Sequence, residues 1–278
     1  MPRPKIWTRI LPAALVLTPV LMAVWAFAIE PGLLVTRRMR LELPGWRDDV
    51  KVAVLSDLHI GSPHVGLDKL REIVQKTNGE NPALVVLLGD FVTGGPNGAR
   101  WGGFVEPEAT AQELKKLHAP LGVFAVLGNH DWWYDGDRVG RALRDAGIPV
   151  LENTAVHIGN AFWLGGIADF WTREPEIAAT LQQVDNDDPV VLITHNPDIF
   201  PHVPARVSLT LAGHTHGGQV RLPGLGPVIT TSKLGYNAGE FVEHGRHLFV
   251  TTGIGTSILP VRFGVPPEIV ILTLSKPR

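Results

Sequence analysis

The sequence predicts an α/β protein, because short apolar runs suited to buried strands alternate with stretches of helical pattern. Five of these runs end in side chains that can bind a metal, and a long uncharged segment precedes them all. Open α/β sheets bind ligands beyond the carboxyl ends of their strands. The residues at those five ends therefore mark the expected functional site.

The composition is that of a globular protein large enough to bury a substantial core. The chain has 278 residues, of which 45% are hydrophobic and 19% charged. Residues 1–45 hold six basic and two acidic residues, which leaves 19 basic and 25 acidic residues, a formal charge of −6, on the rest. An acidic body argues against general nucleic-acid binding. The absence of cysteine excludes disulfides, zinc thiolates and cysteine nucleophiles.

The N-terminal segment predicts a membrane anchor. A basic flank over 1–9 precedes an uncharged run over 10–29 that has about the length of a bilayer crossing. We expect a transmembrane helix over 10–29, with a cleaved signal peptide as the main alternative, because "AFA" at 26–28 resembles a cleavage site. A buried core helix is the third reading. Arginines and lysines lie on both sides of the run, so the membrane orientation stays open.

The expected strands and helices follow in order. Residues 30–48 form a linker and first strand, and 49–278 form the main domain. Apolar runs predict strands at "VKVAVLSD" (50–57), "ALVVLLGD" (83–90), "GVFAVLGNHD" (122–131), "PVVLITHNP" (189–197) and "VSLTLAGHTH" (207–216). Helical patterns cover 67–77, 107–118 and 138–147. The later runs, at 228–230, 246–255 and 267–274, add strands with fewer helices and suggest a second, more mixed sheet.

The candidate metal ligands lie at the ends of these five strands. A single Asp or His after a strand is usually a turn or cap residue, but here the pattern repeats five times. Carboxylate, imidazole and amide donors without thiolate suit manganese, iron or zinc. They are too many for one tetrahedral zinc and about right for two ions that share a carboxylate. The donors are Asp57, His59, Asp90, Asn129, His130, His195, His214 and His216.

The sequence resembles the calcineurin-like metallophosphoesterases over roughly residues 50–275, because it contains five short sequence blocks in the order of that family. The blocks are "DLH" (57–59), "GD" (89–90), "GNHD" (128–131), the histidine of "THNP" (194–197) and "GHTH" (213–216). The resemblance implies a four-layer α-β-β-α sandwich of two mixed sheets flanked by helices, to which the sequence adds the N-terminal transmembrane helix.

The resemblance also implies a role for each donor. One ion would bind Asp57, His59 and His216, and the other would bind Asn129, His195 and His214. Asp90 would bridge the two ions. Mn²⁺ is the expected metal, with Fe, Zn²⁺ and Mg²⁺ as alternatives.

The implied reaction is hydrolysis of a phosphodiester or pyrophosphate bond. A hydroxide activated by the two metals would attack phosphorus, and His130 would protonate the departing oxygen. Asp131 would either orient His130 or cap the following helix. Thr93 and Leu127 replace the Asp and Arg of the phosphoprotein phosphatase branch, which argues against a Ser/Thr phosphatase.

Within this family, the sequence is more similar to a bacterial, membrane-anchored branch, the YkuE/YaeI-type phosphoesterases. The stretches "GHTHGGQVRLP" and "GIGTSILPVRFGVPPEIVILTL" and the N-terminal segment carry this resemblance. The branch includes UDP-2,3-diacylglucosamine pyrophosphatases of lipid A biosynthesis, so a lipid-linked nucleotide is the expected substrate. The expected location is the bacterial inner membrane, which the chain would cross once. The alternatives are a broad-specificity cell-envelope phosphodiesterase or phosphatase, a nuclease and a non-catalytic membrane scaffold.

Aromatic residues gather near the catalytic blocks. Trp132, Trp133 and Tyr134 follow "GNHD" directly, and further aromatic residues lie at 100–104 and 170–171. They would either form a rim that grips acyl chains or a base, or pack over the core and on a bilayer surface, and we favour the second reading. Arg221 and Arg262 could meet a phosphate, but a surface or structural role is the preferred prediction. The sequence leaves the oligomeric state open.

Overall fold

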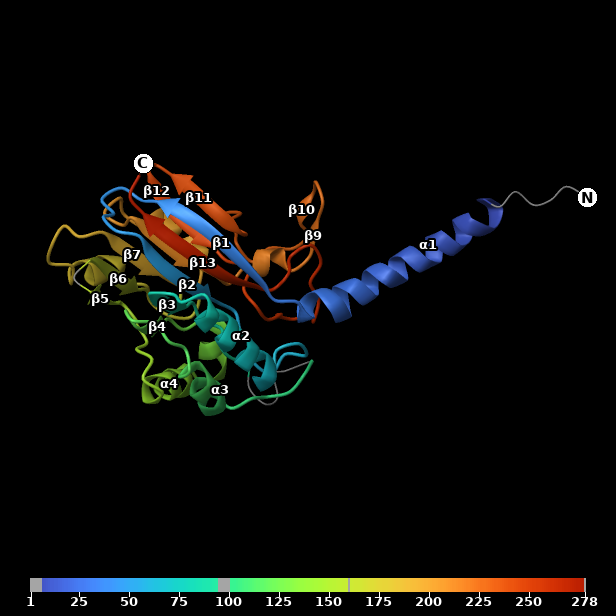
Figure 1. The fold of residues 1–278 in the computed structure, drawn as a ribbon, viewed down its shortest axis with the longest axis horizontal. Helices are drawn as coiled ribbons and strands as arrows, with labels where there is room; N and C mark the ends of the chain where they lie inside the picture. Colours follow the sequence, from blue (N-terminus) through green and yellow to red (C-terminus); the bar gives the residue numbers. More distant parts are fainter. Residues whose placement is uncertain (1–6, 95–100, 160, 278) are drawn as a thin grey trace, which may run out of the picture.

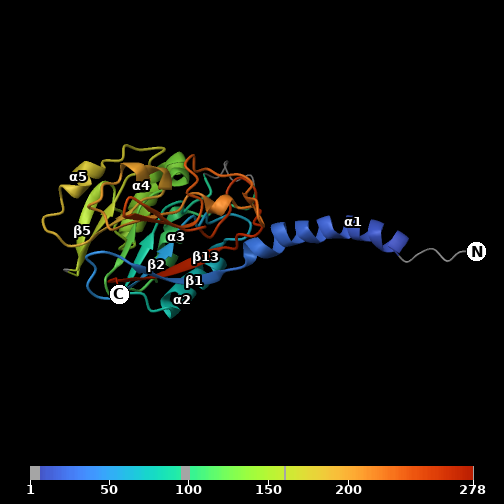
Figure 2. The same cartoon turned by 90° about the horizontal axis from the view of Figure 1, so that it is seen from above.

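The computed structural model describes residues 7–94, 101–159 and 161–277, whose body is built on two large mixed β-sheets (Figures 1 and 2). The first sheet has the order β1-β13-β2-β3-β4, with β1 (Val35–Glu42), β13 (Glu268–Ser275), β2 (Val50–Leu55), β3 (Leu84–Leu87) and β4 (Val123–Ala125). The second has the order β11-β12-β8-β7-β6-β5, with β11 (Gly239–Glu243), β12 (Arg246–Val250), β8 (Leu209–Ala212), β7 (Val190–Ile193), β6 (Phe162–Gly166) and β5 (Thr154–Ile158). A small hairpin joins β9 (Arg221–Leu222) and β10 (Gly226–Pro227).

The strand directions bring five chain segments to one end of the body. In the first sheet β2, β3 and β4 are parallel, and in the second β6, β7, β8 and β12 are parallel. Antiparallel pairs, such as β13 with β2 and β5 with β6, make both sheets mixed. Because parallel strands end at the same edge of a sheet, the segments after β2, β3 and β4 lie close together, as do those after β7 and β8.

The apolar core is divided by the sheets. Strand β2 buries Val52 and Val54 between the two sheets and turns Ala53 and Leu55 toward the helices, so both of its faces are covered. A third cluster, with Leu192 as one member, covers the outer face of the second sheet. The prediction of two mixed sheets flanked by helices is therefore confirmed.

Three helices pack on the outer face of the first sheet, where Figure 1 shows them side by side. They are α2 (Leu67–Gly79), α3 (Pro107–Leu114) and α4 (Asn129–Asp145). The helix predicted at 138–147 is only the second part of α4, since the chain becomes helical at Asn129, with one non-helical residue at Asp135. The physical reason is a cap: Gly128 is extended, and the carboxylate of Asp131 accepts its backbone N–H.

The N-terminal helix α1 (Trp7–Val24) projects away from the body (Figures 1 and 2). It continues into a π-helical turn η1 (Trp25–Ile29) and a 3₁₀ turn η2 (Glu30–Gly32). Among residues 7–94, 101–159 and 161–277, no helix combines the length and apolar character that a membrane crossing needs. The predicted transmembrane helix over 10–29 is therefore not confirmed.

The end of this N-terminal segment is fixed to the domain. Glu30 is buried, and its carboxylate accepts hydrogen bonds from the indole of Trp25 and from the backbone N–H of Val265. The carbonyl of Ala26 accepts a further bond from the backbone N–H of Arg262. The turn at 25–32 thus packs on the loop that precedes β13.

Candidate metal centre

The ends of β2, β3 and β4 in one sheet, and of β7 and β8 in the other, converge on one cluster of polar side chains. The Nε2 atoms of His59 and His216 lie 3.1 Å apart, although the residues follow strands of different sheets and are 157 positions apart in sequence. Asp57 Oδ1 lies 3.3 Å from the same nitrogen of His216. These three side chains therefore face one point between the sheets.

Asp90 lies at the centre of the cluster. Its Oδ2 atom is 3.5 Å from His59 Nε2 and 3.3 Å from His195 Nε2. The same Nε2 atom of His195 also lies 3.1 Å from His214 Nδ1. One carboxylate thus joins the group of His59 and Asp57 to the group of His195 and His214.

Two further donor atoms lack a partner within the described ranges. The Asn129 Oδ1 and His214 Nε2 atoms are buried and have no hydrogen bond there. Buried polar atoms are normally satisfied, so an orphan atom beside other donors indicates an absent partner. A cation would satisfy both atoms, and the donor set of imidazole, carboxylate and amide oxygen suits Mn²⁺, Fe or Zn²⁺.

The spacing of the donor atoms also fits metal ions. Three groups of side chains each bring ligand atoms within 4.8 Å of one another: Asp57 with His59 and His216, Asp57 with Asp90 and His195, and His59 with Asp90 and His130. Asp90 belongs to two of these groups. The residues present therefore fit a site for more than one divalent ion.

Hydrogen bonds behind the histidines aim their rings. His59 Nδ1 lies 3.2 Å from the carbonyl oxygen of Val92, and His195 Nδ1 lies 2.7 Å from that of Leu88. A backbone carbonyl can only accept a hydrogen bond, so the two Nδ1 atoms carry protons and the two Nε2 atoms point into the cluster. This is the usual way in which a protein orients an imidazole ligand.

Burial keeps two of the histidines neutral. It lowers the pKa of His59 to about 3, an effect to which the charge of His130 adds. It also lowers the pKa of His214 to about 3, with His195 adding. A neutral imidazole is the form that binds a metal, so both side chains are ready to act as ligands at neutral pH.

Asp90 and His195 form a buried ion pair. Burial alone would raise the pKa of the Asp90 carboxyl, but the charges of His195 and His130 lower it well below its usual value. Burial alone would lower the pKa of His195, but the carboxylate of Asp90 raises it well above the usual value. Asp90 is therefore ionised, as a ligand shared by two cations has to be.

Many of the donors have an uncommon backbone conformation. Left-handed φ angles of 43° to 71° occur at Asp57, His59, Asp90, His214 and His216. Such angles are unusual for residues with a Cβ atom and cluster at functional sites. The turns after the strands therefore hold the side chains in positions that regular strand geometry would not give.

Steric contacts explain why glycine occupies two positions in these sequence blocks. A Cβ atom on Gly213 would lie 1.9 Å from Ser56 Oγ and 2.6 Å from Asp57 Oδ2. A Cβ atom on Gly128 would lie 2.3 Å from Asp90 Oδ1. Only glycine allows the backbone to come this close to the donor cluster.

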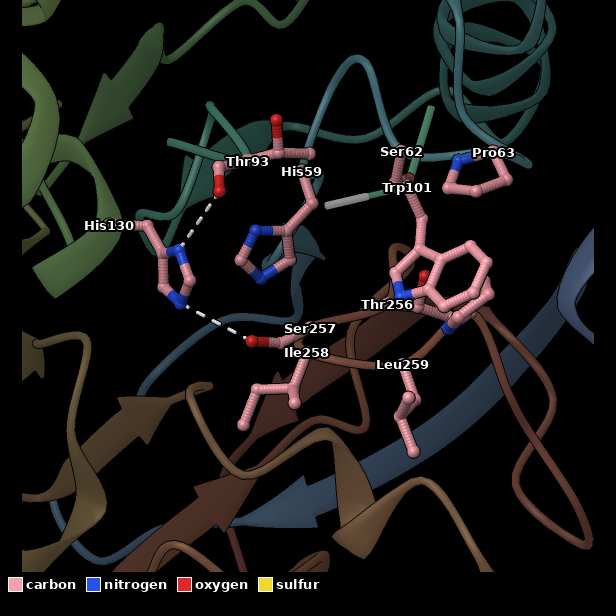
Figure 3. Close-up of a pocket in the computed structure, with 11 residues that line it drawn as sticks. His59, Ser62, Pro63, Thr93, Trp101, His130, Thr256, Ser257, Ile258 and Leu259 are labelled. Carbon is pink, nitrogen blue, oxygen red and sulfur yellow. Dashed lines mark hydrogen bonds between the residues drawn. The ribbon is translucent and has the colours of Figure 1, made fainter. Parts of the chain in front are cut away.

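His130 stands at the open side of the cluster and is half-buried. Figure 3 shows it between two partners, with Nδ1 at 3.3 Å from the carbonyl oxygen of Thr93 and Nε2 at 3.3 Å from Ser257 Oγ. Its backbone N–H donates to Asp90 Oδ1. Ser257 was not singled out in the sequence. It lies 127 positions away, and its only signal is its place in the glycine-rich stretch after β12.

Asp131 lies directly behind Asp90. Its carboxylate accepts hydrogen bonds from four backbone N–H groups, those of Asp90, Phe91, Val92 and Gly128, at 2.8 to 3.2 Å. These contacts favour the helix-capping alternative for Asp131 over the orientation of His130. They also tie the turn that carries Asp90 to the start of α4.

Arg262 is fully buried, which the sequence did not predict. Its guanidinium donates to the carbonyls of Gly255, Thr252 and Val265, and one of its nitrogens lies 3.4 Å from His216 Nδ1. Burial lowers its pKa to about 10, so it remains charged at neutral pH. These contacts agree with a structural role for Arg262. Arg221, in contrast, is exposed at the surface.

Two cavities open beside the cluster, one on each side of His130. The smaller one, of about 200 Å³, is lined by His59, Ser62, Thr93 and Trp101 (Figure 3). The larger one, of about 400 Å³, has Asp90, Asn129, His214 and His216 in its lining, together with Trp133 and Trp171. Both tryptophans thus line a cavity as well as being partly exposed.

Comparison with known proteins agrees with this geometry. The family model for calcineurin-like phosphoesterases matches residues 50–218, which is more than half of the chain, so the chain belongs to the calcineurin-like phosphoesterase family. These enzymes use a dinuclear metal site, and the protein is therefore a hydrolase with side-chain clusters suitable for such a site.

Several bacterial proteins are similar along most of their length. The metallophosphoesterase YkuE of Bacillus subtilis is 30% identical over 261 residues, covering 90% of this chain and 88% of that protein. Phosphodiesterase YaeI of Escherichia coli is 31% identical over 262 residues, with 88% and 90% covered. The UDP-2,3-diacylglucosamine pyrophosphatase LpxG of Chlamydia trachomatis is 27% identical over 319 residues, with 91% and 93% covered.

Proposed function

We propose that this protein hydrolyses a phosphodiester or pyrophosphate bond with the help of two divalent metal ions. The observation that carries the proposal is the position of Asp90, whose Oδ2 atom lies within 3.5 Å of imidazole nitrogens from both halves of the cluster. A carboxylate in this position suits a ligand shared by two ions.

The residues divide into two ligand groups around Asp90. Asp57, His59 and His216 would hold one ion, and Asn129, His195 and His214 the other. When bound, the two ions supply Lewis-acid chemistry, which activates water and neutralises charge on the phosphoryl oxygens. Mn²⁺ is the proposed metal, with Fe, Zn²⁺ and Mg²⁺ as the alternatives that the same donors accept.

His130 is proposed as the general acid. The Thr93 carbonyl holds its Nδ1–H, so Nε2 is the atom that can face the substrate, where Ser257 Oγ now lies. A proton carried on Nε2 would pass to the leaving-group oxygen as its bond to phosphorus breaks. Asp131 is proposed to act indirectly, since its carboxylate fixes the backbone of Asp90 and the first turn of α4.

A lipid-linked nucleotide is the proposed specific substrate, with UDP-2,3-diacylglucosamine as the best candidate. The support is the similarity to the chlamydial pyrophosphatase, but 27% identity supports a shared fold and metal chemistry more strongly than a shared substrate. A broad-specificity phosphodiesterase of the cell envelope is the second candidate, favoured by the 31% identity to YaeI. The acidic body disfavours a nuclease, and the full set of donors disfavours a non-catalytic scaffold.

The bacterial inner membrane stays the predicted location. The sequence supports it through the uncharged run at 10–29, whereas the helices of the described residues give no support for a spanning anchor. Fractionation of cells that express the tagged chain would test this prediction, since a membrane protein sediments with the envelope and resists extraction with high salt.

The reaction is tested with purified protein and two substrates. We expect Mn²⁺-dependent hydrolysis of bis-p-nitrophenyl phosphate and, if the specific proposal is right, of UDP-2,3-diacylglucosamine to UMP and the lipid phosphate. Chelation should stop both reactions, and Mn²⁺ should restore them. Failure to cleave any phosphodiester or pyrophosphate with Mn²⁺, Fe²⁺, Zn²⁺ or Mg²⁺ would contradict the proposal, whereas cleavage of the simple diester alone would favour the second candidate.

A further inference from the structure

The larger cavity shares its lining with the proposed metal ligands. Asp90, Asn129, His214 and His216 contribute to the wall of this space of about 400 Å³. A phosphorus atom held at these donors would therefore place one of its substituents in the cavity. The chemistry of the remaining walls then determines which kind of substituent fits.

Those remaining walls are mostly apolar and unusually exposed. Ile258 is 80% exposed, Ile229 74%, Trp133 61% and Val228 57%, and all four line the cavity. Leu259 and Trp171 line it as well. Large apolar side chains that gather in one open cavity mark a site that an apolar group covers.

Ile258 provides a second, independent observation. Its φ angle is +65°, a conformation that is a genuine outlier for a β-branched residue. The strained backbone holds a large, mostly exposed apolar side chain in the lining of the cavity. Strained residues of this kind persist where function requires them, as in ligand clamps.

The other side of His130 has a different character. The smaller cavity is lined by the polar residues Ser62, Thr93 and Thr256 and by the indole of Trp101, together with Pro63, Ile258 and Leu259 (Figure 3). The loop at 257–259 lines both cavities and so lies between them. The two substituents of a phosphodiester would therefore meet unlike surroundings.

We propose that the larger cavity binds the hydrocarbon part of an amphiphilic phosphoester, with Ile229 and Ile258 as residues that determine this specificity. The proposal rests on the proposed phosphoesterase function and adds the side of the site that the apolar substituent occupies. The polar substituent would then lie on the side of Ser62 and Trp101.

A chain-length series tests the proposal. The substrates are alkyl p-nitrophenyl phosphodiesters from methyl to hexyl, used with Mn²⁺ below the concentration at which they form micelles. Burial of each methylene should raise kcat/KM about twofold to fourfold, so the hexyl ester should exceed the methyl ester by at least about 30-fold.

Two variants test the apolar walls, and Ile229, which is in the lining of the larger cavity and not of the smaller one, identifies the side of the site. Asparagine tolerates the left-handed conformation, so Ile258→Asn removes the apolar side chain without adding backbone strain. Ile229→Ser removes the second apolar wall. Each should lower the hexyl-to-methyl ratio at least about fivefold. Val242→Ser is the matched control, since Val242 is 56% exposed on β11 and should leave the ratio unchanged.

The outcomes separate this inference from the proposed function. If none of the esters is hydrolysed with any of the four metals, the phosphoesterase proposal itself fails. If the methyl ester is hydrolysed but the rate does not depend on chain length, the hydrocarbon site is wrong. A chain-length dependence that both variants retain would also overturn it, because the apolar group would then bind elsewhere.

Discussion

The carboxylate of Asp131 lies 2.9 Å from the backbone nitrogen of Asp90 and accepts its N–H. This contact links the residue at the centre of the donor cluster to the helix that carries His130. The same carboxylate also accepts from Phe91, Val92 and Gly128. One buried side chain therefore fixes two of the turns that form the site.

Replacement of Asp131 by Asn should destabilise the fold. An amide offers one acceptor oxygen and one donor nitrogen where four N–H groups now converge, so buried donors would lose their partner. We expect a loss of about 2–4 kcal/mol in the free energy of unfolding, measured with urea on the metal-free protein. Asp137→Asn, at an exposed position of α4, is the control and should change stability by less than about 0.5 kcal/mol. Equal stability of both variants would contradict the capping role.

Replacement of Asp90 by Asn should remove metal binding and activity together. Asparagine tolerates the φ angle of 56° at this position, so the change removes charge with little backbone strain. Removing a residue that hydrogen-bonds to a metal ligand typically lowers metal affinity or activity about 10–100-fold. Removing the central carboxylate itself should lower them more than about 100-fold. Metal content by mass spectrometry and hydrolysis of bis-p-nitrophenyl phosphate provide the two readouts. A variant that keeps its metal and its rate would show that Asp90 is no bridging ligand.

His130→Ala should keep the metals and lower turnover in a way that depends on the leaving group. Esters of poor leaving groups, such as alkyl alcohols, need a proton and should react about 10²–10⁴-fold more slowly. Esters of p-nitrophenol, which departs as a stable anion, should lose much less. The exposed His118→Ala variant is the control. An equal loss for both classes of ester would argue against a general acid at this position.

Gly213→Ala should displace Asp57. The added Cβ would meet Ser56 Oγ at 1.9 Å and Asp57 Oδ2 at 2.6 Å, so the carboxylate has to move. A shift of about 1 Å in a positioned group can cost about 100-fold in rate, and we expect a loss of that order in kcat/KM. Gly79→Ala is the matched control, because a Cβ at the end of α2 meets nothing within 4 Å. Wild-type activity in Gly213→Ala would show that the close approach has no functional role.

The sequence predicted the class of fold and the donor side chains that the fold brings together, for a physical reason. Each donor block follows a short apolar run, and the parallel strands β2, β3 and β4 carry their blocks to one edge. Local patterns were sufficient for this, because a strand buried on both faces has a recognisable composition. The boundary at "GNHD" was less accurate: Asp131 caps a helix that begins at Asn129, so the expected strand ends at Ala125.

Other features depended on contacts that no local pattern encodes. Ser257 reaches His130 across 127 residues, and Arg262 is buried against His216 through the fold of the loop before β13. The strained conformation of Ile258 likewise has no signature in its own sequence. The uncharged run at 10–29 matched a membrane span by length, yet no helix of the described residues qualifies as a membrane span.

The most direct test of the central claim is anomalous X-ray diffraction at the manganese edge from crystals of the protein loaded with Mn²⁺. The account predicts two anomalous peaks in the cluster, with Asp90 in contact with both. One peak should contact Asp57, His59 and His216, and the other Asn129, His195 and His214. A single peak, or peaks away from these side chains, would contradict the claim that they form a dinuclear metal site.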